Sequence, residues 1–173
     1  MTKTMDIQLR RTTPNDLDFV LSAEQGAENK PFVSVWTRNE HLAALAAKDL
    51  AHLIIESRAS NRSVGYIILA GLADPNRSIE LRRIVVTEKN QGFGREALRL
   101  VKELAFEKLG GHRLWLDVKE HNLRARHVYE SEGFVVEGVI RECIKTEAGF
   151  DSLVLMSMLK QEYEAKRTPR LRA

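Results

Sequence analysis

Hydrophobic residues recur along the chain with two periods, one typical of strands and one typical of helices. Short apolar or alternating runs predict seven strands, at residues 7–10, 52–56, 64–70, 79–86, 112–118, 134–140 and 152–158. Apolar positions spaced by three or four residues predict helices, after Pro14, after Thr37, around residues 95–109 and at residues 122–132. The order is β-α-α-β-β-β-α-β-α-β-β. It indicates an α/β fold, a single-domain mixed sheet of about seven strands with helices on both faces.

The helix expected after Thr37 carries a start signal. Thr37 is a cap candidate, and Glu40 follows three residues later, which is the spacing of a capping box. Within this helix Leu42, Leu45 and Ala46 share one side, and we expect them to form its buried face.

The stretch from Ile79 to Leu109 combines a strand, a glycine-containing turn and a helix. The turn ends in Gly92-Phe93-Gly94. The first N–H groups of a helix lack internal partners and the helix dipole adds positive charge there, so glycines at this point let a phosphate approach the backbone. An ordinary turn would have the same spacing. Two other phosphate-binding patterns are excluded, because no Gly-Lys-Ser/Thr follows the turn and no amino-terminal βαβ unit surrounds it.

Length and composition favour an ordinary globular domain. A chain of 173 residues is typical of one domain with a substantial core. No apolar run reaches the ~18–20 residues needed to cross a membrane, and the amino terminus has no signal-peptide core, so we expect a cytoplasmic protein without membrane contact. Cys143 is the only cysteine, which excludes an internal disulfide framework and a CxxC zinc site. No His, Cys or Asp cluster has ligand spacing, and no metal is expected.

Positive charge is concentrated at the carboxyl end. The net charge is +3, and much of the excess lies in residues 164–173, EAKRTPRLRA. This segment has no interleaved aromatic residues and no motif of a nucleic-acid reader, which favours a solvated tail over nucleic-acid binding. We therefore divide the chain into a domain at residues 1–163 and a basic tail at residues 164–173.

The glycine-containing turn resembles a known cofactor loop. Residues 89–94, Lys-Asn-Gln-Gly-Phe-Gly, resemble the acyl-CoA pyrophosphate loop of the GCN5-related N-acetyltransferase (GNAT) superfamily, whose pattern is Gln/Arg-x-x-Gly-x-Gly/Ala. Lys89 departs from the Gln or Arg of the first position. A register that starts at Gln91 keeps Gly94 but leaves Glu96 where Gly or Ala is expected. The register that keeps both glycines is therefore preferred.

A second segment carries the same resemblance. GNAT proteins have Asn-x-x-Ala-x-x-x-Tyr followed shortly by Gly-Phe, and Asn122, Ala125, Tyr129, Gly133 and Phe134 match this pattern. Ala125 and Tyr129 are four residues apart, and so lie on one face of the predicted helix. The order of strands and helices also resembles the GNAT arrangement over nearly the whole chain.

The resemblance implies an acetyl-CoA-dependent N-acetyltransferase. Residues 138–142 and 151–156 look like the subgroup that contains ribosomal-protein N-terminal alanine acetyltransferases. The expected acceptor is a primary amine, either a protein N-terminus or a small molecule, which attacks the thioester directly. Because no covalent enzyme intermediate is required, Cys143 is not expected to act as a nucleophile.

The resemblance also implies which residues bind the cofactor. Val85 and Val86 are expected to pair with the pantetheine amides, and a backbone N–H of one of them to stabilise the oxyanion. Asn122 is expected to contact the pantetheine or the pyrophosphate. Arg126 is expected to contact an adenosine phosphate, although it would equally suit a solvated helix surface. The backbone amides expected to hold the pyrophosphate are those of Gln91, Gly92, Phe93, Gly94 and Arg95.

Two catalytic roles follow from the resemblance. Tyr129 is expected to protonate the leaving CoA thiolate, and the alternative is a core tyrosine whose hydroxyl simply finds a partner. Glu80 is the candidate base that deprotonates the amine, since GNAT enzymes often place a carboxylate on this strand. Glu80 would equally suit an edge charge paired with Arg82. Glu24, in a polar loop expected at residues 24–31 before the second helix, is the second candidate for the base, and a chain of water molecules is the third.

Two other functions and one assembly are left open. A non-catalytic acyl-CoA-binding sensor or regulatory module on the same fold would keep the loop without needing Tyr129 or a base. Association with nucleic acid through the basic tail would weaken steeply with salt. The strands after Gly133 would offer a sheet edge through which a homodimer can form.

Overall fold

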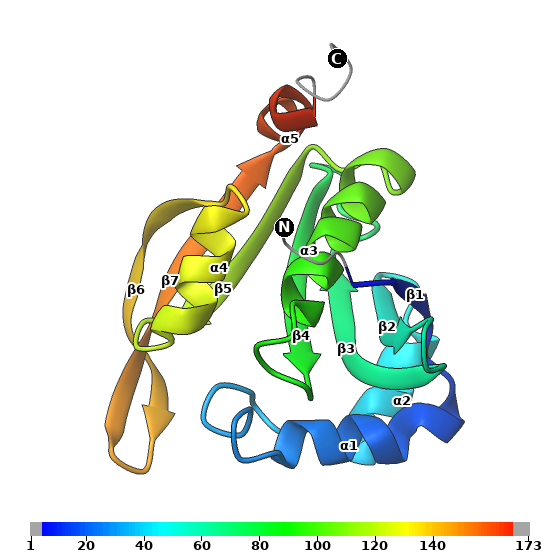
Figure 1. The fold of residues 1–173 in the computed structure, drawn as a ribbon. Helices are drawn as coiled ribbons and strands as arrows, with labels where there is room; N and C mark the ends of the chain where they lie inside the picture. Colours follow the sequence, from blue (N-terminus) through cyan, green and yellow to red (C-terminus); the bar gives the residue numbers. More distant parts are fainter. Residues whose placement is uncertain (1–4, 168–173) are drawn as a thin grey trace.

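Seven strands form one sheet across residues 5–167, the part of the chain that the computed structural model describes (Figure 1). The strand order is β1-β2-β3-β4-β5-β7-β6, and β4 and β5 are the parallel pair in an otherwise antiparallel sheet. The strands are β1 (Ile7–Arg11), β2 (Leu50–Ser57), β3 (Arg62–Ala70), β4 (Ser78–Val86), β5 (Arg113–Lys119), β6 (Val135–Thr146) and β7 (Gly149–Leu159). The predicted single-domain α/β fold with about seven strands is confirmed.

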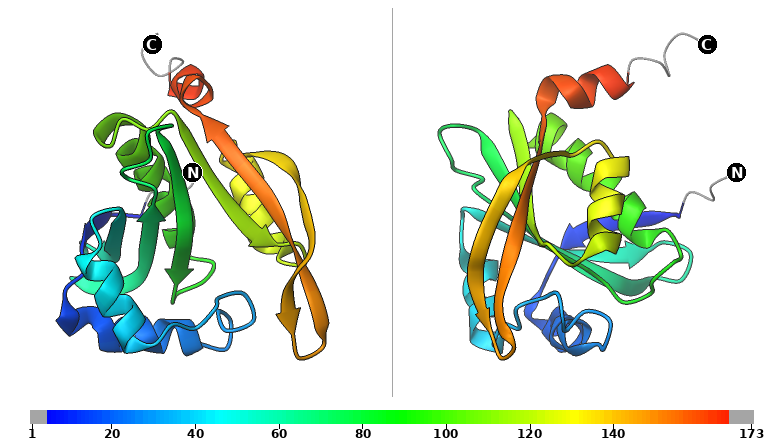
Figure 2. Two further views of the ribbon diagram at one scale, coloured as in Figure 1. Left: turned by 180° about the vertical axis from the view of Figure 1, so that it is seen from behind. Right: turned by 90° about the vertical axis from the view of Figure 1, so that its left-hand side faces the viewer.

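Helices cover both faces of the sheet, as predicted (Figure 2). Neighbouring residues of a strand point to opposite faces, so Ile54 and Tyr66 pack in a buried cluster with α1, whereas Ile55 and Ile67 pack in a second cluster with α3. Within residues 5–167 no helix is long and apolar enough to cross a membrane. The helices are α1 (Leu17–Gln25), α2 (Arg38–Ala46), α3 (Phe93–Glu103), α4 (Leu123–Ser131) and α5 (Lys160–Arg167), with short helical turns η1 (Pro14–Asp16) before α1 and η2 (Leu104–Lys108) after α3.

The sheet splits between its two parallel strands. Pairing between β4 and β5 is confined to three residues on each strand, Ser78–Glu80 with Arg113–Trp115. Beyond this point the strands diverge, and Figure 1 shows a widening gap between them. On its other side, where it pairs with β3, β4 carries a bulge. Arg83 pairs with Ile68 and Leu81 pairs with Leu69, so Arg82 has no partner on β3. A bulge bends a strand and redirects its side chains, which here happens beside the split.

The start of α2 is confirmed, but of its predicted buried face only Leu45 packs against the core, where it is partly buried. The Thr37 hydroxyl accepts a hydrogen bond from the Glu40 N–H, and the Glu40 carboxylate accepts one from the Thr37 N–H, which completes the capping box. The buried residues of α2 are His41 and Ala44, whereas Leu42 is 37% exposed. A buried histidine with polar partners decided the orientation of this helix, and hydrophobicity alone did not reveal it.

A helix that the sequence pattern did not predict follows β7. α5 crosses the predicted domain boundary at residue 163, so the first four residues of the predicted basic tail are helical. The remaining tail, residues 168–173, lies outside the described residues. Tyr163 is the main apolar anchor of α5, and its ring stacks on Phe106 at 5.0 Å. One aromatic residue among charged neighbours gives no helical periodicity, which explains why the helix was missed.

Candidate active site

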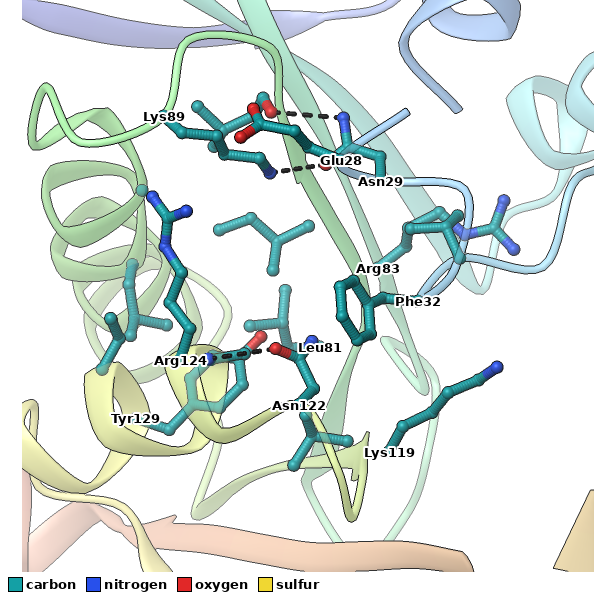
Figure 3. Close-up of a pocket in the computed structure, with 18 of the residues that line it drawn as sticks. Glu28, Asn29, Phe32, Leu81, Arg83, Lys89, Lys119, Asn122, Arg124 and Tyr129 are labelled. Atoms are coloured by element: carbon teal, nitrogen blue, oxygen red, sulfur yellow. Dashed lines mark hydrogen bonds between the residues drawn. The ribbon is translucent and has the colours of Figure 1, made fainter. Parts of the chain in front are cut away.

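A cleft of about 740 Å³ opens where β4 and β5 diverge. Its walls come from β4, β5, the loop between α1 and α2, the loop before α3, and α4. Figure 3 shows Lys89 and Asn29 on one side of this cleft and Asn122 and Tyr129 on another. Elements that are far apart in the sequence therefore meet around one hollow.

The loop before α3 has a backbone geometry that suits an anion. Gly92 is the N-cap of α3 and has φ +88°, a left-handed conformation that favours glycine. The Glu96 N–H bonds the Gly92 carbonyl at 3.1 Å, which closes the first turn. The three N–H groups before it have no partner within the helix and point toward the helix start, where the dipole is positive. Gly92 and Gly94 both line the cleft.

The predicted site residues divide into two groups. Those that line the cleft are Val86, Gly92, Phe93, Gly94, Arg95, Asn122 and Tyr129. Those that do not are Glu80, Val85, Gln91 and Arg126. Val85 is only 1% exposed and packs in the cluster under α1, because it faces the opposite side of β4 from Val86.

Arg124, rather than Arg126, is the α4 arginine that reaches the cleft. One guanidinium nitrogen of Arg126 donates to the Glu120 carbonyl at 3.0 Å, and its Nε is buried without a partner among residues 5–167. Arg124 donates to the Asn90 side chain at 2.9 Å and lines the cleft beside the loop. Its charge is therefore available at the mouth of the cofactor loop.

Tyr129 lies on the α4 wall with a free hydroxyl. Its ring meets Phe134 edge to face at 5.9 Å, which fixes the side chain. Burial, and then the charge of Asp117, raise the pKa of Tyr129 to about 12. Within the described part of the chain nothing hydrogen-bonds to this hydroxyl, so it is protonated at neutral pH and open to the cleft. This is the state that a proton donor needs.

Glu80 is paired with Arg82. Its carboxylate accepts from the Arg82 guanidinium at 2.7 and 3.1 Å. Since Glu80 does not line the cleft, the geometry matches the alternative of an edge charge more closely than that of a base.

Glu24, the second candidate for the base, does not line the cleft and is the centre of a buried polar network, of which Arg83 reaches the cleft. It lies in the last turn of α1 rather than in a loop, and it is fully buried. The carboxylate accepts from the Tyr66 hydroxyl at 2.5 Å, the Arg83 guanidinium at 2.5 Å and the Trp36 N–H at 3.1 Å, and it bonds His41 Nε2 at 3.0 Å. Desolvation acts to raise the pKa of Glu24, but these hydrogen bonds and the Arg83 charge lower it overall. Glu24 is therefore an ionised structural group.

Two histidines extend the network from α2 to β2 and to Thr12, which follows β1. His41 Nδ1 and His52 Nε2 are 3.1 Å apart, and His52 Nδ1 is 2.8 Å from the Thr12 hydroxyl. Burial, and then His41, lower the pKa of His52 to about 4. His52 is therefore neutral at physiological pH, so it adds no positive charge to the buried network.

We expect the protein to lose stability as the pH falls from about 6.5 to about 4. The ordinary pKa of a histidine is 6.5 and that of folded His52 is about 4, so in this window the unfolded chain takes up a proton that the folded chain does not. The loss should be on the order of 3 kcal/mol, because each unit of difference between the two pKa values corresponds to about 1.4 kcal/mol. Urea unfolding at several pH values measures it. His52→Gln should flatten this dependence, and His112→Gln, at an exposed position, should leave it unchanged.

Lys89 ties the cofactor loop to the segment between α1 and α2. Its Nζ donates to the side-chain oxygen Oδ1 of Asn29 at 2.5 Å (Figure 3). The Asn29 side-chain Nδ2 donates to the backbone carbonyls of Val86 at 3.3 Å and Ala23 at 3.0 Å. Desolvation, followed by the charge of Arg124, lowers the pKa of Lys89. The residue that departs from the family pattern thus holds two walls of the cleft together.

The sequence analysis did not single out several cleft residues. They are Asn29, Phe32, Asp117, Lys119 and Arg124. The sequence contained a signal for two of them, Asp117 and Lys119. Leu114, Leu116 and Val118 alternate on β5 and are buried, which leaves Asp117 and Lys119 on the opposite face of the strand. Within residues 5–167, no group of three or more His, Cys, Asp or Glu residues is placed to hold a metal ion.

Comparisons with known proteins identify the family and the fold. A family model described as "Acetyltransferase (GNAT) domain" matches residues 6–135. A spermidine N(1)-acetyltransferase from Vibrio cholerae is 25% identical over 167 residues, covering 91% of this chain and 95% of that protein. The Escherichia coli K12 protein of the same name is 24% identical over 173 residues, covering 94% and 91%. The crystal structure of the Vibrio cholerae spermidine N-acetyltransferase with CoA and spermine has a TM-score of 0.82 at 22% identity and covers 91% of this chain and 98% of that one.

Proposed function

Because residues 6–135 match the family model, the chain belongs to the acetyltransferase (GNAT) family and is an acetyl-CoA-dependent N-acetyltransferase, and we propose that its acceptor is a small-molecule primary amine. The sequence-based prediction of the enzyme class and of acetyl-CoA as cosubstrate is thereby confirmed.

The observation that carries the proposal is the similarity to two spermidine N(1)-acetyltransferases over more than 90% of each chain. This favours polyamines as the first acceptors to test over the protein N-terminus that the ribosomal-protein subgroup would suggest. The subgroup stays a prediction. Thiol release from acetyl-CoA, measured in parallel with spermidine and with a peptide that begins with alanine, tests it. A higher kcat/KM with the peptide would overturn the small-molecule proposal.

The chain offers acetyl-CoA a backbone cradle and a free strand edge. The N–H groups at the start of α3 suit the pyrophosphate, and the charges of Lys89 and Arg124 lie beside them. Beyond Glu80, β4 has no strand partner on the β5 side, so its backbone is open to amides of the pantetheine arm. The Asn29 amide already bonds the Val86 carbonyl, which limits this pairing to other groups of β4.

The proposed chemistry is direct attack of the neutral amine on the thioester carbonyl. The thiolate then leaves with the electron pair of the C–S bond and must be protonated. The Tyr129 hydroxyl suits this step, because it is protonated and faces the cleft without a partner among residues 5–167. Tyr129 is thus proposed as the general acid.

Replacing Tyr129 by phenylalanine should lower kcat about a hundredfold, the usual contribution of a general acid. The dissociation constant of acetyl-CoA should stay within about twofold, because the ring and its Phe134 contact are kept. Thiol release and isothermal titration measure the two quantities. Tyr163→Phe is the matched control, since that hydroxyl bonds Glu107 away from the cleft. Full turnover by Tyr129→Phe would show that the thiolate leaves without this phenol.

The homodimer stays a prediction, now located on β6. This strand is an edge of the sheet. Its exposed large aliphatic residues are Val135, Val136, Val139 and Ile140, each between 42% and 53% exposed. Exposed apolar edges favour pairing with a second chain, and one Vibrio cholerae spermidine N-acetyltransferase structure is described as dodecameric.

A further inference from the structure

We propose that Asp117 of β5 receives the acceptor amine and accepts its proton, an inference that rests on the acetyltransferase function proposed above. The sequence-based candidates for this role were Glu80, Glu24 and a water chain. Glu80 is bound to Arg82 and Glu24 is enclosed in its own network, and neither lines the cleft.

Asp117 lies where the split in the sheet exposes it. β5 loses contact with β4 after Trp115, so Asp117 is two residues into the segment that faces open space. Leu116 and Val118 point to the face covered by α3 and α4, and Asp117 therefore points to the other face. Tyr129 belongs to α4, on the first face. The carboxylate and the phenol thus approach the split from opposite sides.

This arrangement separates the two substrates. The cofactor loop at the start of α3 and Tyr129 share the face of α3 and α4. Figure 3 shows Phe32 and Lys119 across the cleft from Arg124 and Tyr129. An acceptor amine that enters on this second side meets Asp117 before it reaches the split. A carboxylate at that point both attracts an ammonium group and orients it toward the thioester.

Asp117 has no partner, unlike its neighbours. It forms no hydrogen bond or ion pair through its side chain with any of residues 5–167. Charged groups near it are already matched: Glu80 with Arg82 on β4, and Lys119 with Asp151. The Asp117 side chain is exposed to the cleft, so a ligand can reach this unpaired carboxylate. The ammonium of an acceptor would be the missing partner.

The environment also raises the basicity of Asp117, whose side chain is exposed to the open cleft. Desolvation, and then the charge of Glu80, raise its pKa, while Arg82 acts in the opposite direction. Tyr129 is close enough that the Asp117 charge contributes to its raised pKa. The pKa values of Asp117 and Tyr129, which share one cleft, are thus both raised. This suits a base and an acid that act in one reaction.

The protons balance with these two groups. The acceptor enters as an ammonium with three protons on nitrogen, and the product amide keeps one. Asp117 takes the first proton and passes it to solvent, and the neutral amine attacks the thioester carbon. Asp117 then takes the second proton from the positively charged nitrogen. The C–S bond then breaks, and its electron pair stays on sulfur. Tyr129 protonates the resulting thiolate. The proton held by Asp117 returns to the Tyr129 phenolate through solvent. One proton is released overall.

The test compares Asp117→Asn, Asp117→Glu and Glu80→Gln with the intact protein, using acetyl-CoA and spermidine. Asp117→Asn should lower kcat about a hundredfold. It should also remove the acid limb of the kcat profile, in which activity falls as the pH drops through the pKa of Asp117. Asp117→Glu should recover part of kcat, and Glu80→Gln should lower it less than Asp117→Asn does. Asp6→Asn, at an exposed ion pair with Arg58, is the control and should match the intact protein.

A second readout separates catalysis from folding. Because the pKa of folded Asp117 is raised, the folded state binds its proton more tightly than the unfolded state, and ionised Asp117 lowers stability at neutral pH. Asp117→Asn should therefore keep or raise the Tm and keep the acetyl-CoA dissociation constant within about threefold. Activity of Asp117→Asn equal to that of the intact protein would overturn this inference alone. An intact protein that acetylates no amine would overturn the proposed function and this inference with it.

Discussion

Replacing Gly92 by aspartate is expected to weaken acetyl-CoA binding about a thousandfold, roughly 4 kcal/mol. The carboxylate would stand at the start of α3, where the backbone N–H groups and the helix dipole favour an anion. It would satisfy these donors itself and repel the pyrophosphate. Each hydrogen bond to a charged group contributes about 1.5–3 kcal/mol, so the loss of two accounts for the expected change. Isothermal titration of acetyl-CoA measures it.

The control for this prediction is Gly110→Asp. Gly110 also has a left-handed backbone, with φ +68° against +88° for Gly92, but it lies outside the cleft. The two variants impose the same kind of backbone strain, and aspartate tolerates this region better than most residues. Only the Gly92 variant should lose binding. Equal loss in both variants would mean that strain, rather than the anion site, explains the effect.

The features that the sequence predicted are those that local chemistry determines. The glycines of the cofactor loop are required by the backbone there, and Gly92 has the positive φ that only a glycine adopts freely. The capping box of Thr37 and Glu40 needs contacts only within one turn. The match of Tyr129 to a family motif led to a residue that lines the cleft. Each of these depends on residues that are close in sequence.

The base was harder to predict because its choice depends on tertiary structure. Glu80 and Asp117 are both carboxylates on strands beside apolar residues, and nothing in the sequence tells which one is paired. In the folded protein Arg82 forms an ion pair with Glu80, whereas the separation of β4 from β5 exposes the face of β5 that carries Asp117. The role of Glu24 was hard to predict for the same reason. This residue looked like part of a polar loop, but His41 and Arg83, distant in sequence, surround it in the core.

The buried network around Glu24 gives the second large prediction, a loss of about 4 kcal/mol in the free energy of unfolding for Glu24→Leu. Removing one partner of a buried ion pair costs about 3–5 kcal/mol because the other charge is left uncompensated. Here that charge is the Arg83 guanidinium, which is held 4.4 Å from the Trp36 ring and has a side chain only 9% exposed. The Tyr66 hydroxyl and His41 would lose their acceptor as well. Urea unfolding at pH 7 measures the change.

Two further variants identify the cause of that loss. Asp18→Asn removes an ion pair with Arg38 in which the Asp18 side chain is 88% exposed, and it should change the free energy of unfolding by no more than about 0.5 kcal/mol. Glu24→Leu combined with Arg83→Leu should be more stable than Glu24→Leu alone, because the uncompensated cation is gone. If the double variant is less stable than the single one, the cost comes from the hydrogen bonds of Tyr66 and His41 rather than from the Arg83 charge.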